Sequence, residues 1–128
     1  SIRGRGKLTL GGCCSVNSGV IFGLTCDITI GNYVLIADNV SFRTADHIFS
    51  DINLPIAEQG ENNGEICIED DVWIGANVVI LRGVKIGKGA IISANSVVNR
   101  NIDPYEIVRG VPIKFVKKRM GANSVKSQ

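Results

Sequence analysis

A six-residue period runs through residues 68–98 and limits the folds that this chain can adopt. Apolar residues recur at every sixth position, and a second set, mostly of smaller residues, follows four positions later. The first set is Ile68, Ile74, Ile80, Ile86, Ile92 and Val98, and the second is Val72, Val78, Val84, Ala90 and Ser96. An α-helix, with about 3.6 residues per turn, cannot keep both sets on one face. We therefore predict short strands separated by turns and stacked as a solenoid, with the repeated Ile pointing inward.

The same spacing extends upstream and then stops at one long segment. It passes through Leu10, Val16, Phe22 and Ile28 and, after a shift of two residues, through Ile30, Ile36 and Phe42. Residues 43–65 carry no repeat, are mostly polar, and contain His47, the only histidine of the chain. A long loop that leaves a repeat array is commonly functional, so we expect the active site to involve this loop.

The spacing suggests a single domain over residues 1–128. We expect N-terminal coils at 8–42, an active-site loop at 43–65, C-terminal coils at 66–100, an extension with a short helix at 101–120, and a flexible tail at 121–128. The helix is expected because Pro112 suits a first helical position and Ile113, Val116 and Met120 would share one face. The chain begins with Ser rather than Met, which fits a processed chain or a fragment lacking an N-terminal portion.

Composition argues against several classes of function. The net charge of +2 does not indicate a large nucleic-acid surface. No apolar run is long enough to span a membrane, and no signal peptide opens the sequence. The four cysteines form no Cys-x-x-Cys pair and only one histidine is present, which argues against a zinc site. We expect a cytoplasmic protein without a required metal.

Three features together carry a family resemblance. They are the hexad array with VWIG at residues 72–75, the loop histidine, and the ending YEIVRGVPIKFVKKR at residues 105–119. Over residues 8–119 the chain resembles the hexapeptide-repeat acyltransferases, and within them the sugar and polysaccharide O-acetyltransferases of the maltose and galactoside acetyltransferase type. The resemblance implies an all-β, left-handed parallel β-helix and a homotrimer with active sites between neighbouring subunits.

The resemblance also implies an acceptor side of the site. Its members place their general base at the position of His47, and histidine can accept a proton near neutral pH. Asn17 matches a position that holds the acceptor hydroxyl in galactoside-type enzymes, although an Asn in a tight turn would look the same. Asp46 or Asp51 could orient the imidazole, but acids in a loop are commonly just solvated.

The donor side is implied in the same way, with acetyl-CoA as co-substrate. Trp73, which would point out of the array between Val72 and Ile74, matches the tryptophan that walls the acetyl and pantetheine end of the cleft. The backbone N–H of Ala76 lies where relatives place their donor to the thioester oxygen, and Ala94 matches a backbone contact to the pantetheine arm. The family's basic contacts to the CoA phosphates match Arg100, Lys114 and Lys117, although each could equally belong to a solvated face.

We therefore predict an acetyl-CoA-dependent O-acetyltransferase that acts by direct transfer on a sugar hydroxyl, in a surface polysaccharide or its precursor. N-acetylation of a nucleotide-linked amino sugar and acetylation of an antibiotic are alternatives. A non-enzymatic trimeric scaffold is a further one. A carbonic anhydrase of this repeat type needs three histidines for its metal, which this chain cannot supply.

Overall fold

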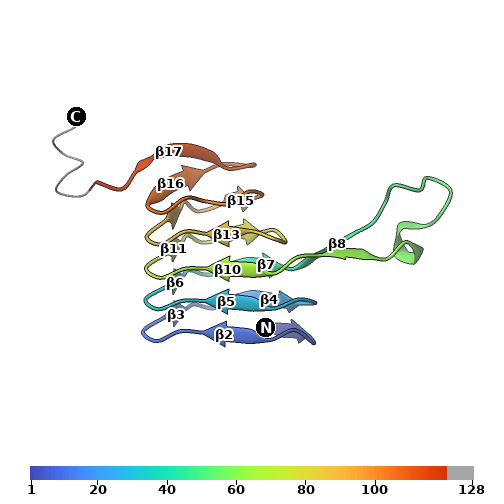
Figure 1. Ribbon diagram of the computed structural model, residues 1–128, viewed down its shortest axis with the longest axis horizontal. Coiled ribbons are helices and arrows are strands. Elements are labelled where there is room, and N and C mark those ends of the chain that lie inside the picture. Colours follow the sequence, from blue (N-terminus) through green and yellow to red (C-terminus); the bar gives the residue numbers. More distant parts are fainter. Residues whose placement is uncertain (121–128) are drawn as a thin grey trace.

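The chain winds through three parallel sheets in turn and stacks its coils along one axis (Figure 1). The structure, a computed structural model, describes residues 1–120; the predicted tail at 121–128 lies outside the described residues. Sheet A consists of β1 (Ile2–Gly4), β4 (Ile21–Leu24), β7 (Ser41–Arg43), β12 (Val79–Ile80) and β15 (Val97–Val98). Sheet B consists of β2 (Leu8–Leu10), β5 (Ile28–Ile30), β10 (Ile66–Ile68) and β13 (Lys85–Ile86). Sheet C consists of β3 (Ser15–Val16), β6 (Leu35–Ile36), β11 (Trp73–Ile74), β14 (Ile91–Ile92), β16 (Glu106–Arg109) and β17 (Lys114–Lys118).

The six-residue period produces vertical stacks of identical residues inside the solenoid. In sheet C the register pairs Ile74 with Ile36 and with Ile92, so one side chain sits directly above the next. All six residues of the first set, from Ile68 to Val98, are at most 1% exposed. The predicted inward orientation is therefore confirmed. Leu10 and Val16 keep the spacing but are 44% and 40% exposed, because they belong to the first coil and no coil covers them from below.

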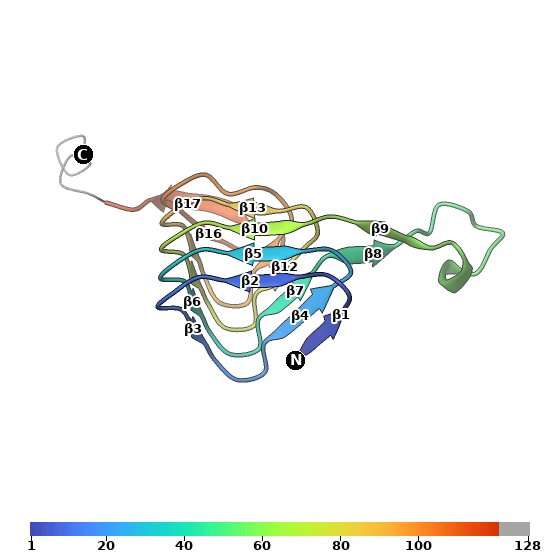
Figure 2. The ribbon, with the colours of Figure 1, turned by 60° about the horizontal axis from the view of Figure 1, so that its bottom comes forward.

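Three edges separate the sheets, and we name each by the sheets that it joins. Each coil of the solenoid turns from sheet to sheet at these edges (Figure 2). At the C/A edge the turns place Asn39, Asn77 and Asn95 at φ values of 60° to 64°, a region that Asn tolerates better than most residues. Gly75 lies at the same edge, where a Cβ atom would come within 2.6 Å of the backbone nitrogen of Ala94. Consecutive coils therefore leave no room for a side chain at this position.

The loop predicted at residues 43–65 leaves the A/B edge as a long arm (Figure 1). We call residues 45–63 the arm; it contains β8 (Ala45–His47), the 3₁₀ turn η1 (Ile56–Glu58) and β9 (Glu61–Asn63). Strands β8 and β9 pair with each other in antiparallel fashion and with no strand of the solenoid. Beyond the arm the stack resumes in register, with Ile68 beside Ile30.

The helix predicted within residues 101–120 is wrong. The chain turns at residues 110–112, and Lys114–Lys118 form β17, which pairs antiparallel with β16 at the end of sheet C. The last coil leaves the backbone groups of β16 open on one side, and a returning strand satisfies them. A free-standing helix of eight residues would be marginal in water, and Phe115 and Val116 favour a strand. No helix among residues 1–120 is long and apolar enough to cross a membrane.

Candidate functional site

His47 is held away from the solenoid, near the base of the arm. It is the last residue of β8 and lies opposite Glu61 of β9. Thr44, which is 1% exposed, fastens the root of the arm, because its hydroxyl donates to the carbonyl of Gly23 and accepts from the N–H of Thr25. His47 itself is exposed, so its imidazole is open to a ligand or to another chain.

The two acids considered as partners of His47 have other contacts. Oδ2 of Asp46 accepts a hydrogen bond from Nε of Arg82 at 2.8 Å. The two side chains form an ion pair that ties the arm to the solenoid. Asp51 accepts from the backbone N–H of Asn53 at 2.9 Å and so shapes the tip of the arm. Within residues 1–120 the imidazole of His47 has no hydrogen-bond partner.

Asn17, Ala76 and Ala94 lie in three different coils along the C/A edge. Asn17 follows β3, and its side-chain oxygen accepts from the hydroxyl of Ser15 at 3.4 Å. Ala76 and Ala94 follow β11 and β14 at equivalent turn positions, and the N–H of Asn95 donates to the carbonyl of Ala76. Within residues 1–120 the backbone N–H groups of Ala76 and Ala94 have no acceptor. The C/A edge thus offers two free donors in line, which suits an elongated acyl donor.

Ala94 and Lys114 are brought together at the C-terminal end of this edge. They line a hollow of about 740 Å³ between the turn at 93–95 and strand β17. Arg109 also lines it and was not found by the sequence reasoning. Its position directly before the Gly-Val-Pro turn was the available signal. The hollow combines two cations with the exposed ring of Phe115, features that suit a phosphorylated aromatic group.

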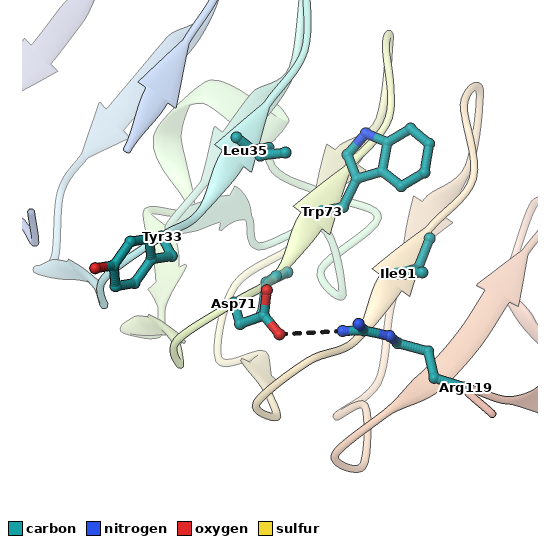
Figure 3. A pocket seen from close by; sticks show the side chains of 7 residues that line it. Tyr33, Leu35, Asp71, Trp73, Ile91 and Arg119 are labelled. Atoms are coloured by element: carbon teal, nitrogen blue, oxygen red, sulfur yellow. Dashed lines mark hydrogen bonds and ion pairs between the residues drawn. The ribbon is translucent and has the colours of Figure 1, made fainter. Parts of the chain in front are cut away.

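Trp73 stands on the outer face of sheet C, between the C/A edge and the B/C edge. It points outward from β11, as predicted, and is 53% exposed. Its row continues through Leu35 of β6 and Ile91 of β14 on the two sides (Figure 3). This row is an apolar strip that crosses the strands of sheet C, and Ala76 at the C/A edge lies three residues beyond Trp73 along the chain.

The two remaining basic residues lie elsewhere. Arg100 is at the A/B edge, where its Nη1 donates to the carbonyl of Asn101 and to the buried Glu106 carboxylate, at 2.8 and 3.4 Å. It therefore neutralises an internal acid of the last coil. Lys117 is exposed on β17 but does not line the hollow beside Lys114.

The predicted residues thus form two groups on one chain. His47 and Arg100 belong to the A/B edge and its arm, whereas Asn17, Ala76 and Ala94 belong to the C/A edge, with Trp73 and Lys114 next to it. Figure 2 shows the arm leaving the solenoid at a different edge from the turns that follow β3 and β6. Residues 1–120 contain no group of three or more His, Cys, Asp and Glu side chains placed to hold a metal ion.

Comparison with known proteins points in one direction. The family profile "Bacterial transferase hexapeptide (six repeats)" matches residues 68–100. A probable acetyltransferase of Mycobacterium tuberculosis is 43% identical over 93 residues, which cover 73% of this chain and 31% of that protein. A probable macrolide acetyltransferase of Lysinibacillus sphaericus is 38% identical over 114 residues, which cover 77% of this chain and 63% of that protein.

Solved structures agree with these relatives. A hexapeptide-repeat acetyltransferase from Vibrio cholerae, solved in complex with acetyl coenzyme A, matches 87% of this chain and 60% of its own, with a TM-score of 0.82 and 37% identity. A maltose O-acetyltransferase from Clostridium difficile matches 89% of this chain and 60% of its own, with a TM-score of 0.82 and 35% identity. The chain spans less than two thirds of the length of each of these four proteins.

Proposed function

Because the chain belongs to the hexapeptide-repeat transferases, with their left-handed parallel β-helix, we propose that it is an acetyl-CoA-dependent O-acetyltransferase. The acceptor is a sugar hydroxyl in a surface polysaccharide or its precursor. One observation carries the donor assignment: the free N–H groups of Ala76 and Ala94 lead along the C/A edge to the hollow with Arg109 and Lys114. An extended thioester with phosphates at its far end fits that order of donors and cations.

In this mechanism the acceptor hydroxyl attacks the thioester carbonyl directly. The imidazole of His47 takes the hydroxyl proton as the new C–O bond forms. The N–H of Ala76 donates to the oxyanion of the tetrahedral intermediate, and Asn17 holds the acceptor oxygen. The C–S bond then breaks, and the thiolate of CoA takes the proton back from the imidazolium. Trp73 walls the acetyl group from water.

The proposed site needs more than one copy of the chain, since His47 and the C/A edge are separate on each copy. We therefore propose a homotrimer in which the arm of one copy lies against the C/A edge of the next. The outer faces of the sheets support this arrangement. Sheet A presents Ile21, Val79 and Val97, whereas sheet B presents the exposed Thr9 and Thr29. Apolar outer faces are typical of surfaces that self-associate.

A second candidate, acetylation of a macrolide-type antibiotic, is favoured by the tip of the arm. Phe49 and Ile52 are 72% and 94% exposed, and Leu54 and Ile56 are 47% and 53% exposed. This apolar tip would suit an acceptor with an apolar face, and one relative is named as a probable macrolide acetyltransferase. The same tip also fits the apolar outer face of the next copy in the trimer, and in that case its exposure does not bear on the acceptor. The sugar therefore remains the first candidate.

The test is a screen of acceptors with ¹⁴C-labelled acetyl-CoA. Simple sugars, oligosaccharides, nucleotide amino sugars and macrolides are incubated with the protein, and the acetylated product is identified by mass spectrometry. We expect O-acetylation of a saccharide that is lost in the His47→Asn variant. Label on a macrolide alone would select the second candidate, and label on an amino group would overturn O-acetylation. The four free cysteines make detection of released CoA by a thiol reagent unsuitable. Unpaired cysteines also fit the cytoplasmic location that we propose.

A further inference from the structure

A second hollow lies on sheet C, beside the row that contains Trp73 (Figure 3). Its volume is about 180 Å³, and it is bordered by Tyr33, Asp71 and Arg119 at the B/C edge and by Leu35, Trp73 and Ile91 on the strands. None of its residues was assigned a role above except Trp73. The hollow therefore shares Trp73 with the proposed site, and none of its residues lines the hollow that contains Arg109 and Lys114.

The walls of this hollow are aromatic and exposed. Tyr33 is 63% exposed and Trp73 is 53% exposed, and Leu35 between them is 50% exposed. Tyr33 stands at a turn with φ 59°, a conformation that a bulky side chain rarely adopts. Its ring is largely exposed and lies outside the buried core, so packing does not require a tyrosine here. Aromatic faces with a few polar groups are typical walls of a ligand site.

Asp71 supplies a polar group on the B/C side of the hollow. Its Oδ2 accepts from Nη1 of Arg119 at 3.1 Å, and the same Nη1 donates to the carbonyl of Gly89 at 3.0 Å. Arg119 also lies 6.0 Å from the centre of the Tyr105 ring, which fixes it further. The pair neutralises charge and orients the carboxylate. Within residues 1–120 Oδ1 of Asp71 has no partner, so it remains a free acceptor for hydroxyl groups.

We infer that this hollow is a second saccharide subsite and that the natural acceptor is an oligosaccharide or polysaccharide rather than a single sugar. The inference rests on the proposed function. Figure 3 shows the rings of Tyr33 and Trp73 on opposite sides of the hollow, so each ring can stack against the C–H groups of a different sugar unit, while Asp71 accepts from hydroxyls. An anionic ligand is not favoured, because Arg119 is already paired and Asp71 would repel it.

The position of the hollow relative to the reacting edge sets the length of the acceptor. Tyr33 lies four residues before Ala37, which continues the register that pairs β3 with β6 and so lies level with Asn17. At about 3.3 Å per residue of extended chain, Tyr33 at the far wall of the hollow is up to about 13 Å from the edge where the acceptor hydroxyl reacts, whereas Leu35 and Trp73 lie nearer to it. A single pyranose ring bound against Tyr33 does not reach that edge, whereas a chain of linked sugars does.

The experiment measures binding without acetyl-CoA, so that it does not depend on turnover. Trp73 is the only tryptophan, and its fluorescence reports directly on the hollow. The probes are glucose, maltose and maltotetraose, and galactose with its β-1,4-linked tetramer. We expect a tetrasaccharide of at least one series to bind about tenfold more tightly than its monosaccharide. One additional hydrogen bond to a charged group such as Asp71 increases affinity by about that factor.

Two variants test the residues and one serves as a control. Asp71→Asn and Tyr33→Asn both introduce a residue that tolerates the positive φ of these turns, so the backbone is preserved. We expect each to reduce the gain of the tetrasaccharide over the monosaccharide to less than about twofold. Asp103→Asn, at an exposed position of the same edge outside the hollow, should leave the gain intact.

Equal binding of monosaccharide and tetrasaccharide in both series, or an undiminished gain in the Asp71 and Tyr33 variants, would overturn the inference. A changed sedimentation coefficient of the Tyr33 variant, with no quenching by any sugar, would assign the hollow to contacts between copies and would also overturn it. Failure of the proposed function has a different signature, since a tetrasaccharide would then quench Trp73 but receive no acetyl group from acetyl-CoA.

Discussion

In the proposed trimer each site takes its base from the arm of one copy and its other groups from the C/A edge of the next. Two inactive variants, one altered in each part, should therefore restore activity when they form mixed trimers. The first variant, His47→Asn, removes the base from the arm but keeps the side chain's size and a hydrogen-bonding group. The second, Asn17→Ala, removes the amide from the C/A edge. Both positions are exposed and lie outside the Ile stack, so neither change should disturb the fold.

The expected magnitudes follow from the trimer geometry. General-base catalysis is worth about 10²–10⁴-fold, so trimers of the His47 variant alone should retain about 1% of turnover or less. In a random mixture of equal amounts, half of the arms and half of the edges are wild type. Half multiplied by half gives about a quarter of the sites with both wild-type parts, so turnover should recover to about a quarter of that of wild type.

The assay uses equal amounts of the two variants, unfolded together and refolded, and the whole mixture is measured without separating the homotrimers. Transfer of labelled acetyl to the acceptor is then measured per site. A matched control mixes wild-type chains with the double variant. If each site uses two chains, that mixture gives about a quarter of wild-type turnover, whereas sites within one chain give about half. Absence of recovery in the first mixture together with half activity in the control would refute the shared site.

Three further outcomes are expected. Replacing Lys114 and Arg109 with Ala should raise the KM for acetyl-CoA with little change in kcat, since phosphate contacts hold ground state and transition state equally; steady-state kinetics with dephospho-CoA thioester should show a smaller penalty. Replacing Ile80, which is fully buried, with Ala should lower the free energy of unfolding by about 2–5 kcal/mol in urea titration. Asp46→Ala should break the 2.8 Å contact with Arg82 and lower kcat by loosening the arm. It should cost less than about 1 kcal/mol of stability in urea titration, because the pair is largely exposed. An unchanged kcat would show that this contact does not position His47.

The periodic part of the fold could be predicted from the sequence because the same constraint acts on every coil. Ile74 and Ile92 occupy equivalent places in adjacent coils, so each confirms the orientation of the other. The long loop after Phe42 could also be predicted, because the number of residues from Phe42 to Ile68 is not a multiple of six and the period therefore breaks there. Trp73 was predicted to point outward from its place between two inward residues, and it does.

The parts that sequence reasoning missed depend on partners that are distant along the chain. Lys114–Lys118 form a strand because the last coil leaves β16 unpaired on one side, and no local pattern reports that open edge. Arg109 enters the donor hollow because the chain folds back at residues 110–112. The separation of His47 from Asn17 on one chain could not be predicted either. In the proposed site these residues lie close together only when two chains assemble.

The arm enters the solenoid between two coils whose strands remain in register, with Ile68 still beside Ile30 after more than thirty intervening residues. An insertion at such an edge adds only closure entropy, about 0.6 kcal/mol for each doubling of loop length, and leaves every stacked residue in place. The arm can therefore be replaced by another loop without changing the register of the solenoid. Grafting the arm of a relative between Thr44 and Gly64, whose backbones are already bridged by a 2.8 Å hydrogen bond, should alter which acceptors are used while the donor groove of the host is retained.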